Sequence, residues 1–117
     1  MTQGYQNTWP IHPALVSTVH ELPGFRLRSM GIVNGSDIRE APPLTLWKSK
    51  RHEVAAHYRA GRQQALIELM RAAAQLGANA IVGVRYETNH VVGPFGAGSW
   101  LTEIVAHGTA VWADQTA

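Results

Sequence analysis

The sequence contains no cysteine, and this absence excludes disulfide bonds, thiolate catalysis and zinc or iron–sulfur sites built on cysteine. Charged residues are also scarce, at 15% of the chain, and a net charge of +2 is too small to indicate nucleic acid as a partner. No apolar run approaches the roughly 18 residues that a membrane span needs. The start of the chain, Met-Thr-Gln-Gly-Tyr-Gln, lacks the charged and apolar stretches of a signal peptide, so we expect a cytoplasmic protein.

What is present predicts one small globular domain, because 45% of the 117 residues are hydrophobic. Residues 1–14 are polar and broken by prolines, which indicates an irregular N-terminal arm. Trp9 and Ile11 would either attach this arm to a neighbouring surface or belong to a frayed terminus. We expect the domain to occupy residues 15–113 and a short tail to occupy residues 114–117.

The centre of the chain predicts a long helix followed by a buried strand. Strong helix formers fill residues 66–76, Ser49 is a plausible N-cap, and Gly77 is a typical helix terminator. The following residues, 80–88, form a short apolar run rich in β-branched side chains. The pattern therefore predicts a helix over residues 49–76 and a strand over residues 80–88.

Alternating side chains predict two further main strands, over residues 25–33 and 101–112. Asn34-Gly35-Ser36 is interpreted as the end of the first, and residues 36–48 as a connection. Residues 15–19 predict a small edge strand, and the glycine-rich residues 93–99 predict a hairpin loop. The order strand, helix, strand, strand predicts a two-layer α+β fold with a mixed three-stranded sheet, in which the apolar last strand is central.

The predicted helix carries more apolar surface than one small sheet can cover. One broad stripe, which includes Leu66 and Leu69, should pack on the sheet. A second apolar group lies on a different side of the helix, and the chain has little left to cover it. We therefore expect self-association through this second group: Ala56, Ala60, Ile67, Met70 and Ala74.

Several segments, in this order, resemble YbjQ-like proteins, a family that carries a heavy-metal-binding label. The most specific is Leu-Gly-Ala-Asn-Ala-Ile-Val-Gly-Val at residues 76–84, accompanied by Leu-Pro-Gly-Phe at 22–25, Gly-Ile-Val-Asn-Gly at 31–35 and Gly-Thr-Ala-Val at 108–111. The resemblance implies a β-α-β-β fold similar to that of dodecin subunits. It also implies a ring-shaped homopentamer. It supplies no reaction.

Without cysteine, a metal site would use histidine and carboxylate ligands, which suit zinc, nickel or copper. Glu53 and His57 are four residues apart on the predicted helix and could hold one ion, or belong to a solvated polar face. Glu103 and His107 share a face of the last strand, but about 13 Å separates such positions, so one chain cannot use both for one ion. His107 would otherwise be a packed or interface histidine.

Arg62 falls in the helix stripe that should face the sheet, where a guanidinium must be paired. We interpret it as a structural ion pair or as an anion contact. No nucleophile, phosphate-binding or dinucleotide motif accompanies it. The sequence therefore predicts a non-enzymatic oligomer that binds a small ligand or serves as a scaffold, with no cofactor. The alternative is a divalent-metal binder that uses residues at subunit interfaces.

Overall fold

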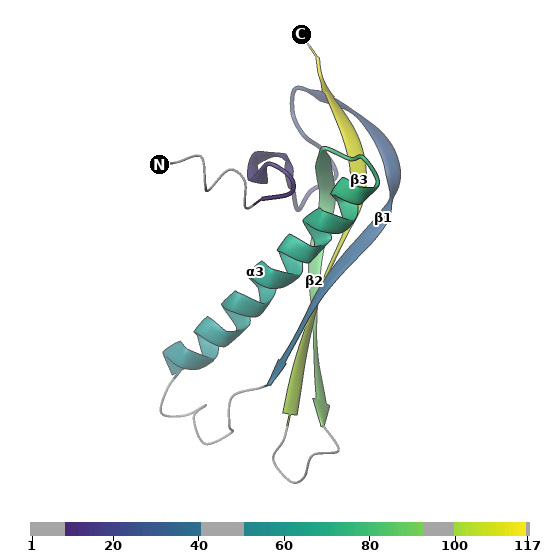
Figure 1. The fold of residues 1–117 in the computed structure, drawn as a ribbon. Helices are drawn as coiled ribbons and strands as arrows, with labels where there is room; N and C mark the ends of the chain where they lie inside the picture. Colours follow the sequence, from purple (N-terminus) through teal and green to yellow (C-terminus); the bar gives the residue numbers. More distant parts are fainter. Residues whose placement is uncertain (1–8, 41–50, 93–99, 117) are drawn as a thin grey trace, which may run out of the picture.

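The computed structural model describes residues 9–40, 51–92 and 100–116, and it shows one long helix lying across one face of a three-stranded sheet (Figure 1). The elements are the 3-10 turn η1 (Pro13–Leu15), β1 (Phe25–Glu40), α3 (Arg51–Gln75), β2 (Ala80–Val92) and β3 (Trp100–Gln115). The strand order is β1-β3-β2. The predicted α+β architecture and the central place of the last strand are confirmed.

The sheet is antiparallel, so the prediction of a mixed sheet was wrong. β3 pairs antiparallel with β1 on one side and with β2 on the other. The crossover through α3 does make β1 and β2 parallel to each other. They form no ladder, however, because β3 lies between them and takes up the hydrogen bonds that face it on both sides.

β1 does not end at Asn34-Gly35-Ser36 but continues through this sequence to Glu40. Gly35 lies under α3, and a Cβ atom built on it would be 2.1 Å from the backbone nitrogen of Leu69 and 2.6 Å from the carbonyl oxygen of Ala65. Glycine is needed here for close approach of strand and helix backbones, rather than for a turn.

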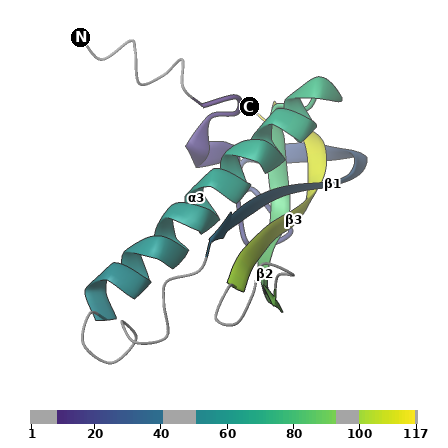
Figure 2. The ribbon, with the colours of Figure 1, turned by 60° about the horizontal axis from the view of Figure 1, so that its bottom comes forward.

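The helix packs on the side of the sheet to which the even-numbered residues of β3 point. Ile104, Ala106 and Ala110 on this strand are fully buried against the core, as are Ala65 and Leu69 of α3. α3 crosses the sheet obliquely (Figure 2) and contacts β1 and β3 far more than β2. Part of β2 is therefore left for another segment to cover.

That segment is residues 9–20. Ile11 is 3% exposed and belongs to the core, and Trp9 packs against it, so these two residues attach the arm to the chain's own domain. Val16 forms a single parallel bridge with Ile81 of β2, and the Ser17 amide donates to the Ile81 carbonyl. The edge strand predicted over residues 15–19 is reduced to this bridge, because a bulge at residues 82–85 interrupts β2 beside it.

The N-terminal segment also shows that Met70 was wrongly predicted to lie in an oligomer interface. Met70 is 1% exposed and lies in the core, where the cavity between α3, β2 and the N-terminal segment places it next to Trp9 and Val16. The chain itself therefore covers Met70, one member of the second apolar group. The other predicted interface residues retain exposure: Ala56, Ala60 and Ala74 are exposed, and Ile67 is half-buried.

Three sequence predictions fall outside the described residues: the N-cap at Ser49, the end of the connection at residues 41–48 and the hairpin loop at residues 93–99. The helix terminator is described. Gly77 has a φ of 84°, and the amides of residues 76–78 donate to the carbonyls of Ala73 and Ala74. No helix in the described part of the chain has both the length and the apolar character needed to cross a membrane.

Candidate ligand-binding site

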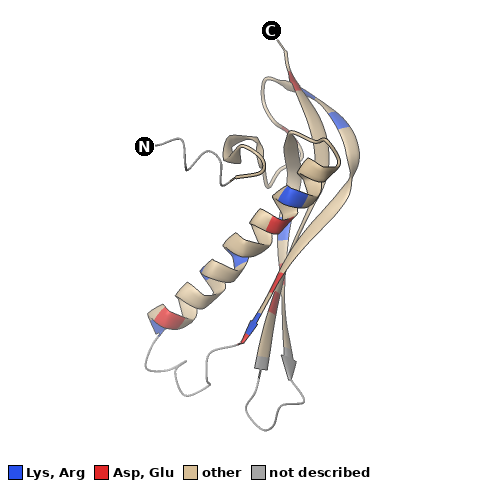
Figure 3. Cartoon of the chain, in the orientation of Figure 1, with Lys and Arg blue, Asp and Glu red and all other residues tan. Residues whose placement is uncertain are grey.

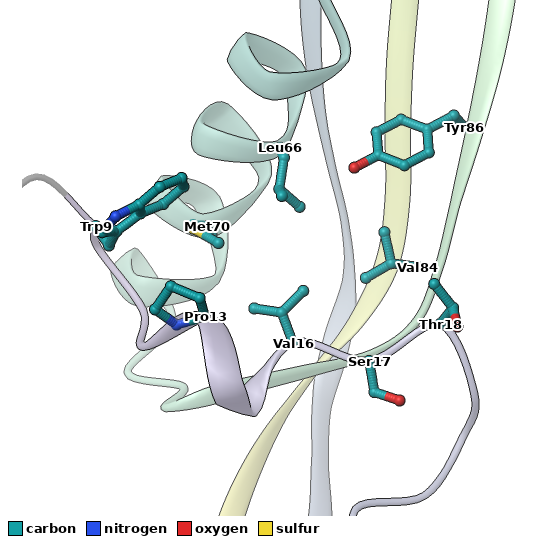
Figure 4. A pocket seen from close by; sticks show the side chains of 9 residues that line it. All are labelled: Trp9, Pro13, Val16, Ser17, Thr18, Leu66, Met70, Val84 and Tyr86. Atoms are coloured by element: carbon teal, nitrogen blue, oxygen red, sulfur yellow. The ribbon is translucent and has the colours of Figure 1, made fainter. Parts of the chain in front are cut away.

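A cavity of about 250 Å³ lies between the N-terminal segment, α3 and β2, and we call it the N-terminal cavity. Figure 4 shows Trp9 and Pro13 on one side with Met70 of α3 beside them, Leu66 above, and the β2 side chains opposite. Val16 points from the N-terminal segment into the space between them. The described residues that line the N-terminal cavity are mainly apolar: Trp9, Pro13, Val16, Ser17, Thr18, Leu66, Met70, Val84 and Tyr86.

The cavity exists because three elements meet without closing on one another. The bulge in β2 turns Val84 and Tyr86 toward the helix layer, and the Val84 amide donates to the Ser17 carbonyl over 3.0 Å. This bond keeps the N-terminal segment beside β2, while α3 lies over the other two strands. An apolar cavity of about 150 Å³ can hold benzene in a protein, so this space has room for one small ring system.

Tyr86 supplies the main polar group of the cavity wall. Burial raises the pKa of its hydroxyl, and the positive charge of Arg62 acts against this by favouring the phenolate. The hydroxyl points toward the cavity in Figure 4, so it can donate a hydrogen bond to a ligand. Sequence reasoning missed Tyr86, although its alternation with Val84 on a strand was visible.

Arg62 itself is exposed, so the prediction that it lies buried on the sheet was wrong. Among the described residues it forms no ion pair within 4.0 Å. The long aliphatic stem of an arginine lets its charged end reach solvent from a helix that packs on a sheet. Its charge remains close enough to Tyr86 to affect the pKa of that hydroxyl.

The two predicted metal ligands on α3 differ in exposure. His57 is half-buried against the sheet, where its Nε2 lies 3.3 Å from the hydroxyl of the fully buried Thr102, while Glu53 is exposed. His57 therefore does not belong to a solvated face. Burial, followed by the nearby charge of Arg39, lowers its pKa.

The second predicted pair, on β3, is also divided. The carboxylate of Glu103 accepts a hydrogen bond from Asn89 over 3.1 Å. His107 is half-buried, and its Nε2 lies 3.6 Å from Glu87. Within residues 9–40, 51–92 and 100–116, no three His, Asp or Glu side chains come together as metal ligands would.

On α3, charge gives no further indication of a binding surface. Basic and acidic residues are both present on α3 and on the strands in Figure 3. Arg71 pairs with Glu68 one helical turn away, and Arg39 pairs with Asp37 over 2.5 Å. The N-terminal cavity is therefore the candidate site that geometry favours on the helix side of the molecule.

The chain is similar to UPF0145 proteins of Burkholderia. It is 32% identical to one from Burkholderia orbicola, over 100% of both chains, and 33% identical to one from Burkholderia thailandensis, over 86% of this chain and 94% of the relative. A crystal structure of a DUF74-family protein of unknown function from Pediococcus pentosaceus matches with a TM-score of 0.64 at 16% identity, over 85% of this chain and 96% of that one. This second likeness shows the fold.

A family model covers nearly the whole domain. The YbjQ model, described as "Putative heavy-metal-binding", matches residues 14–114. These residues include β1, α3, β2 and all of β3 except its last residue. Together with the Burkholderia relatives, the match shows that this chain belongs to the YbjQ family, whose UPF0145 members it resembles along its whole length.

Proposed function

We propose that the protein binds a small, largely apolar compound in the N-terminal cavity and that its role there is binding rather than catalysis. The observation that carries this proposal is the partly open, mainly apolar cavity of about 250 Å³ between Trp9, Met70 and Tyr86. Sites for drug-sized compounds are larger, at roughly 300–1,000 Å³, so the ligand is about one or two rings in size.

The polar groups of the described lining fit binding better than chemistry. They are hydroxyls and one indole N–H, and none of the described lining residues is a histidine or a carboxylate that could act as a base. The Tyr86 hydroxyl would donate to a single acceptor on the ligand. The nearby charge of Arg62 would favour an acceptor that is electron-rich or anionic.

Titration of the ¹⁵N-labelled full-length protein with indole tests this proposal. Saturable shifts are expected at Trp9, Val84 and Tyr86. Val16→Phe places a ring in the cavity and should weaken indole binding about tenfold or more. Val19→Phe is the matched control, because Val19 lies in the same segment, is 59% exposed and does not line the cavity.

Two outcomes would contradict the cavity as a binding site. Either wild type shows no saturable shifts, or Val16→Phe binds indole as wild type does while melting at a similar temperature. Tyr86→Phe separates shape from hydrogen bonding, since it keeps the ring. It should weaken an acceptor ligand such as phenol by about two- to tenfold and leave toluene unaffected.

We also propose that the protein is a homo-oligomer, and that a second copy covers the sheet face opposite α3, which we call the open face. Two large aliphatic side chains are exposed there: Ile32 is 86% exposed and Ile38 is 60% exposed. The face also carries charges of both signs, with Arg85 and His107 beside Glu87 and Glu103. It is therefore able to complement another copy of itself.

Mass in solution tests the assembly and its number of subunits, for which the family resemblance implies five. Ile38→Lys should shift the mass toward the monomer without changing the fold, because this side chain projects into solvent in the single chain. Ala74→Lys on α3 is the matched variant for association through the helix. A monomeric wild type, or dissociation by Ala74→Lys alone, would contradict the open face as the interface.

Divalent-metal binding is the alternative that the family description suggests. Within a single chain, the described side chains form no group of three potential ligands to support it. It would require ligands from more than one copy. Metal analysis of the intact assembly, with and without added zinc, tests this separately. A bound ion that is lost in both His57→Gln and His107→Gln would favour it over the cavity proposal.

A further inference from the structure

A second, smaller pocket lies on the open face where β2 is irregular. The register of β2 against β3 shifts between Val82 and Arg85, and Gly83 within this bulge has a φ of 65°. The Gly83 amide donates to the Val19 carbonyl over 2.9 Å, which holds the following residue, His20, over the bulge. Bulges often redirect side chains next to functional sites.

Position 83 favours glycine for two reasons: its φ is positive, and the His20 ring leaves no room for a side chain. A Cβ atom on Gly83 would lie 2.5 Å from Cε1 and 2.8 Å from Nδ1 of His20. The imidazole therefore lies directly against the bulge. Arg85, two residues further, is paired in register with His107 of β3, so the two side chains lie on the same face of the sheet.

These residues line a partly open space of about 160 Å³, which we call the sheet pocket. This volume is about that of five waters. Ile32 of β1 forms the apolar wall, Thr109 adds a hydroxyl, and Gly83 and Gly108 contribute wall without side chains. A small ligand can approach the backbone closely at such glycines.

The chemistry of the pocket is cationic and donor-rich. Its described lining contains one guanidinium, two imidazoles and a hydroxyl, and it contains no carboxylate. Nε2 of His107 is buried and has no hydrogen-bond partner among the described residues. Glu87 lies nearby, but its Oε1 is 3.6 Å from that nitrogen, and its side chain is 64% exposed. A buried polar atom in this state indicates a missing partner.

We propose that the sheet pocket binds a small oxyanion, either a phosphate or a carboxylate group, through Arg85, His20 and His107. Arginine matches the planar spacing of oxyanion oxygens, and an imidazole N–H can donate to a further oxygen. A metal cation fits less well, because Arg85 repels it and only two imidazoles are available as ligands. This site is distinct from the N-terminal cavity, which lies on the other side of the sheet.

Calorimetric titration of the full-length protein tests the proposal, with inorganic phosphate in one arm and acetate in the other, at constant ionic strength. Arg85→Gln should weaken binding of the preferred anion about tenfold or more, because it removes a charge-assisted contact. Arg28→Gln removes an exposed arginine of β1 that does not line the pocket, and it should bind as wild type does. Arg85→Lys should keep part of the affinity, and thermal melting confirms that each variant is folded.

Three results would overturn the proposal: no saturable binding of either anion, equal losses in Arg85→Gln and Arg28→Gln, or zinc binding at His20 and His107 that phosphate does not affect. Ile32 lines the sheet pocket and is part of the open face, so self-association would affect access to the pocket. The mass in solution is therefore measured in each titration. Phosphate binding by the Ile38→Lys variant would separate the anion site from self-association. Indole binding remains an independent readout of the N-terminal cavity.

Discussion

The two faces of the sheet differ in what covers them: α3 packs on one, and the other leaves large aliphatic side chains exposed. Under α3, Ile104, Ala106 and Ala110 of β3 are fully buried, and Gly35 of β1 leaves no side chain between strand and helix. On the open face, Ile32 and Ile38 are large and exposed. Small residues permit the helix to approach closely, whereas large aliphatic residues gain stability only when something covers them. The exposed isoleucines are therefore what supports the proposal that a second copy covers the open face.

Gly35→Ala should have the largest effect on the sheet face under α3, which we call the covered face. The new methyl group would lie 2.1 Å from a backbone nitrogen and 2.6 Å from a carbonyl oxygen of α3, and backbone atoms cannot rotate away as a side chain does. We expect a loss of about 4 kcal/mol or more in the free energy of unfolding, which is enough to unfold many domains. Urea denaturation followed by circular dichroism measures it.

The neighbouring position provides the control for that prediction. Ser36 is exposed on the opposite side of the same strand, and Ser36→Ala should change the free energy of unfolding by less than about 0.5 kcal/mol. A folded Gly35→Ala variant with near-normal stability would show that α3 can move away from β1. The close helix–strand approach would then not be a fixed feature of the fold.

Two aliphatic truncations, one on each face of the sheet, should differ by an intermediate amount in the free energy of unfolding. Leu69 is fully buried on the covered face, and Leu69→Ala should cost about 3 kcal/mol through lost burial and the cavity left behind. Ile32→Ala on the open face should cost less than about 0.5 kcal/mol in a monomeric background such as Ile38→Lys. Denaturant midpoints at equal slope give both values.

Ile32→Ala is also informative in the otherwise wild-type chain, where self-association is not blocked by Ile38→Lys. If a second copy covers Ile32, Ile32→Ala should become destabilising at protein concentrations that favour assembly. An effect of Ile32→Ala that is small and independent of protein concentration would contradict burial of this residue between copies. The comparison therefore tests the partner of the open face without requiring its structure.

The sequence predicted the elements because their signals are local. The helix formers before Gly77, the β-branched run after Asn79 and the alternation in the last strand each fix a conformation without knowledge of neighbours. The central position of β3 also followed from its apolar character. Asn34-Gly35-Ser36 was misinterpreted because a glycine needed for tertiary approach has the same local signature as a turn glycine.

Long-range packing explains the errors at the candidate sites. Met70 was assigned to a partner surface because no local feature shows that residues 9–16 fold back over it. Arg62 and His57 were placed on the wrong sides of α3, since the angle at which the helix crosses the sheet is not encoded in its own periodicity. The sheet pocket had one visible signal, a glycine inside a strand at position 83, which often marks a bulge.

The smallest expected effect concerns the beginning of α3, where the covered face becomes polar. Because the pKa of His57 is lowered by burial and then by Arg39, the unfolded chain takes up a proton on this imidazole at higher pH than the folded chain does. The stability linked to His57 is therefore complete above the unfolded pKa of 6.5 and is lost as the pH falls from there through the folded pKa. Wild type should lose stability across this window.

His57→Gln should reduce that loss, because glutamine does not titrate and can still bond to the Thr102 hydroxyl. The measurement is the difference in unfolding free energy between about pH 7.5 and about pH 5 for wild type and variant. His52→Gln, at an exposed position of the same helix, controls for the removal of an imidazole. An identical pH dependence in wild type and His57→Gln would mean that His57 is as hydrated in the folded chain as in the unfolded one. In that case α3 would cover the sheet only from Gly61 onward, and the two faces would be equally open at this end of the molecule.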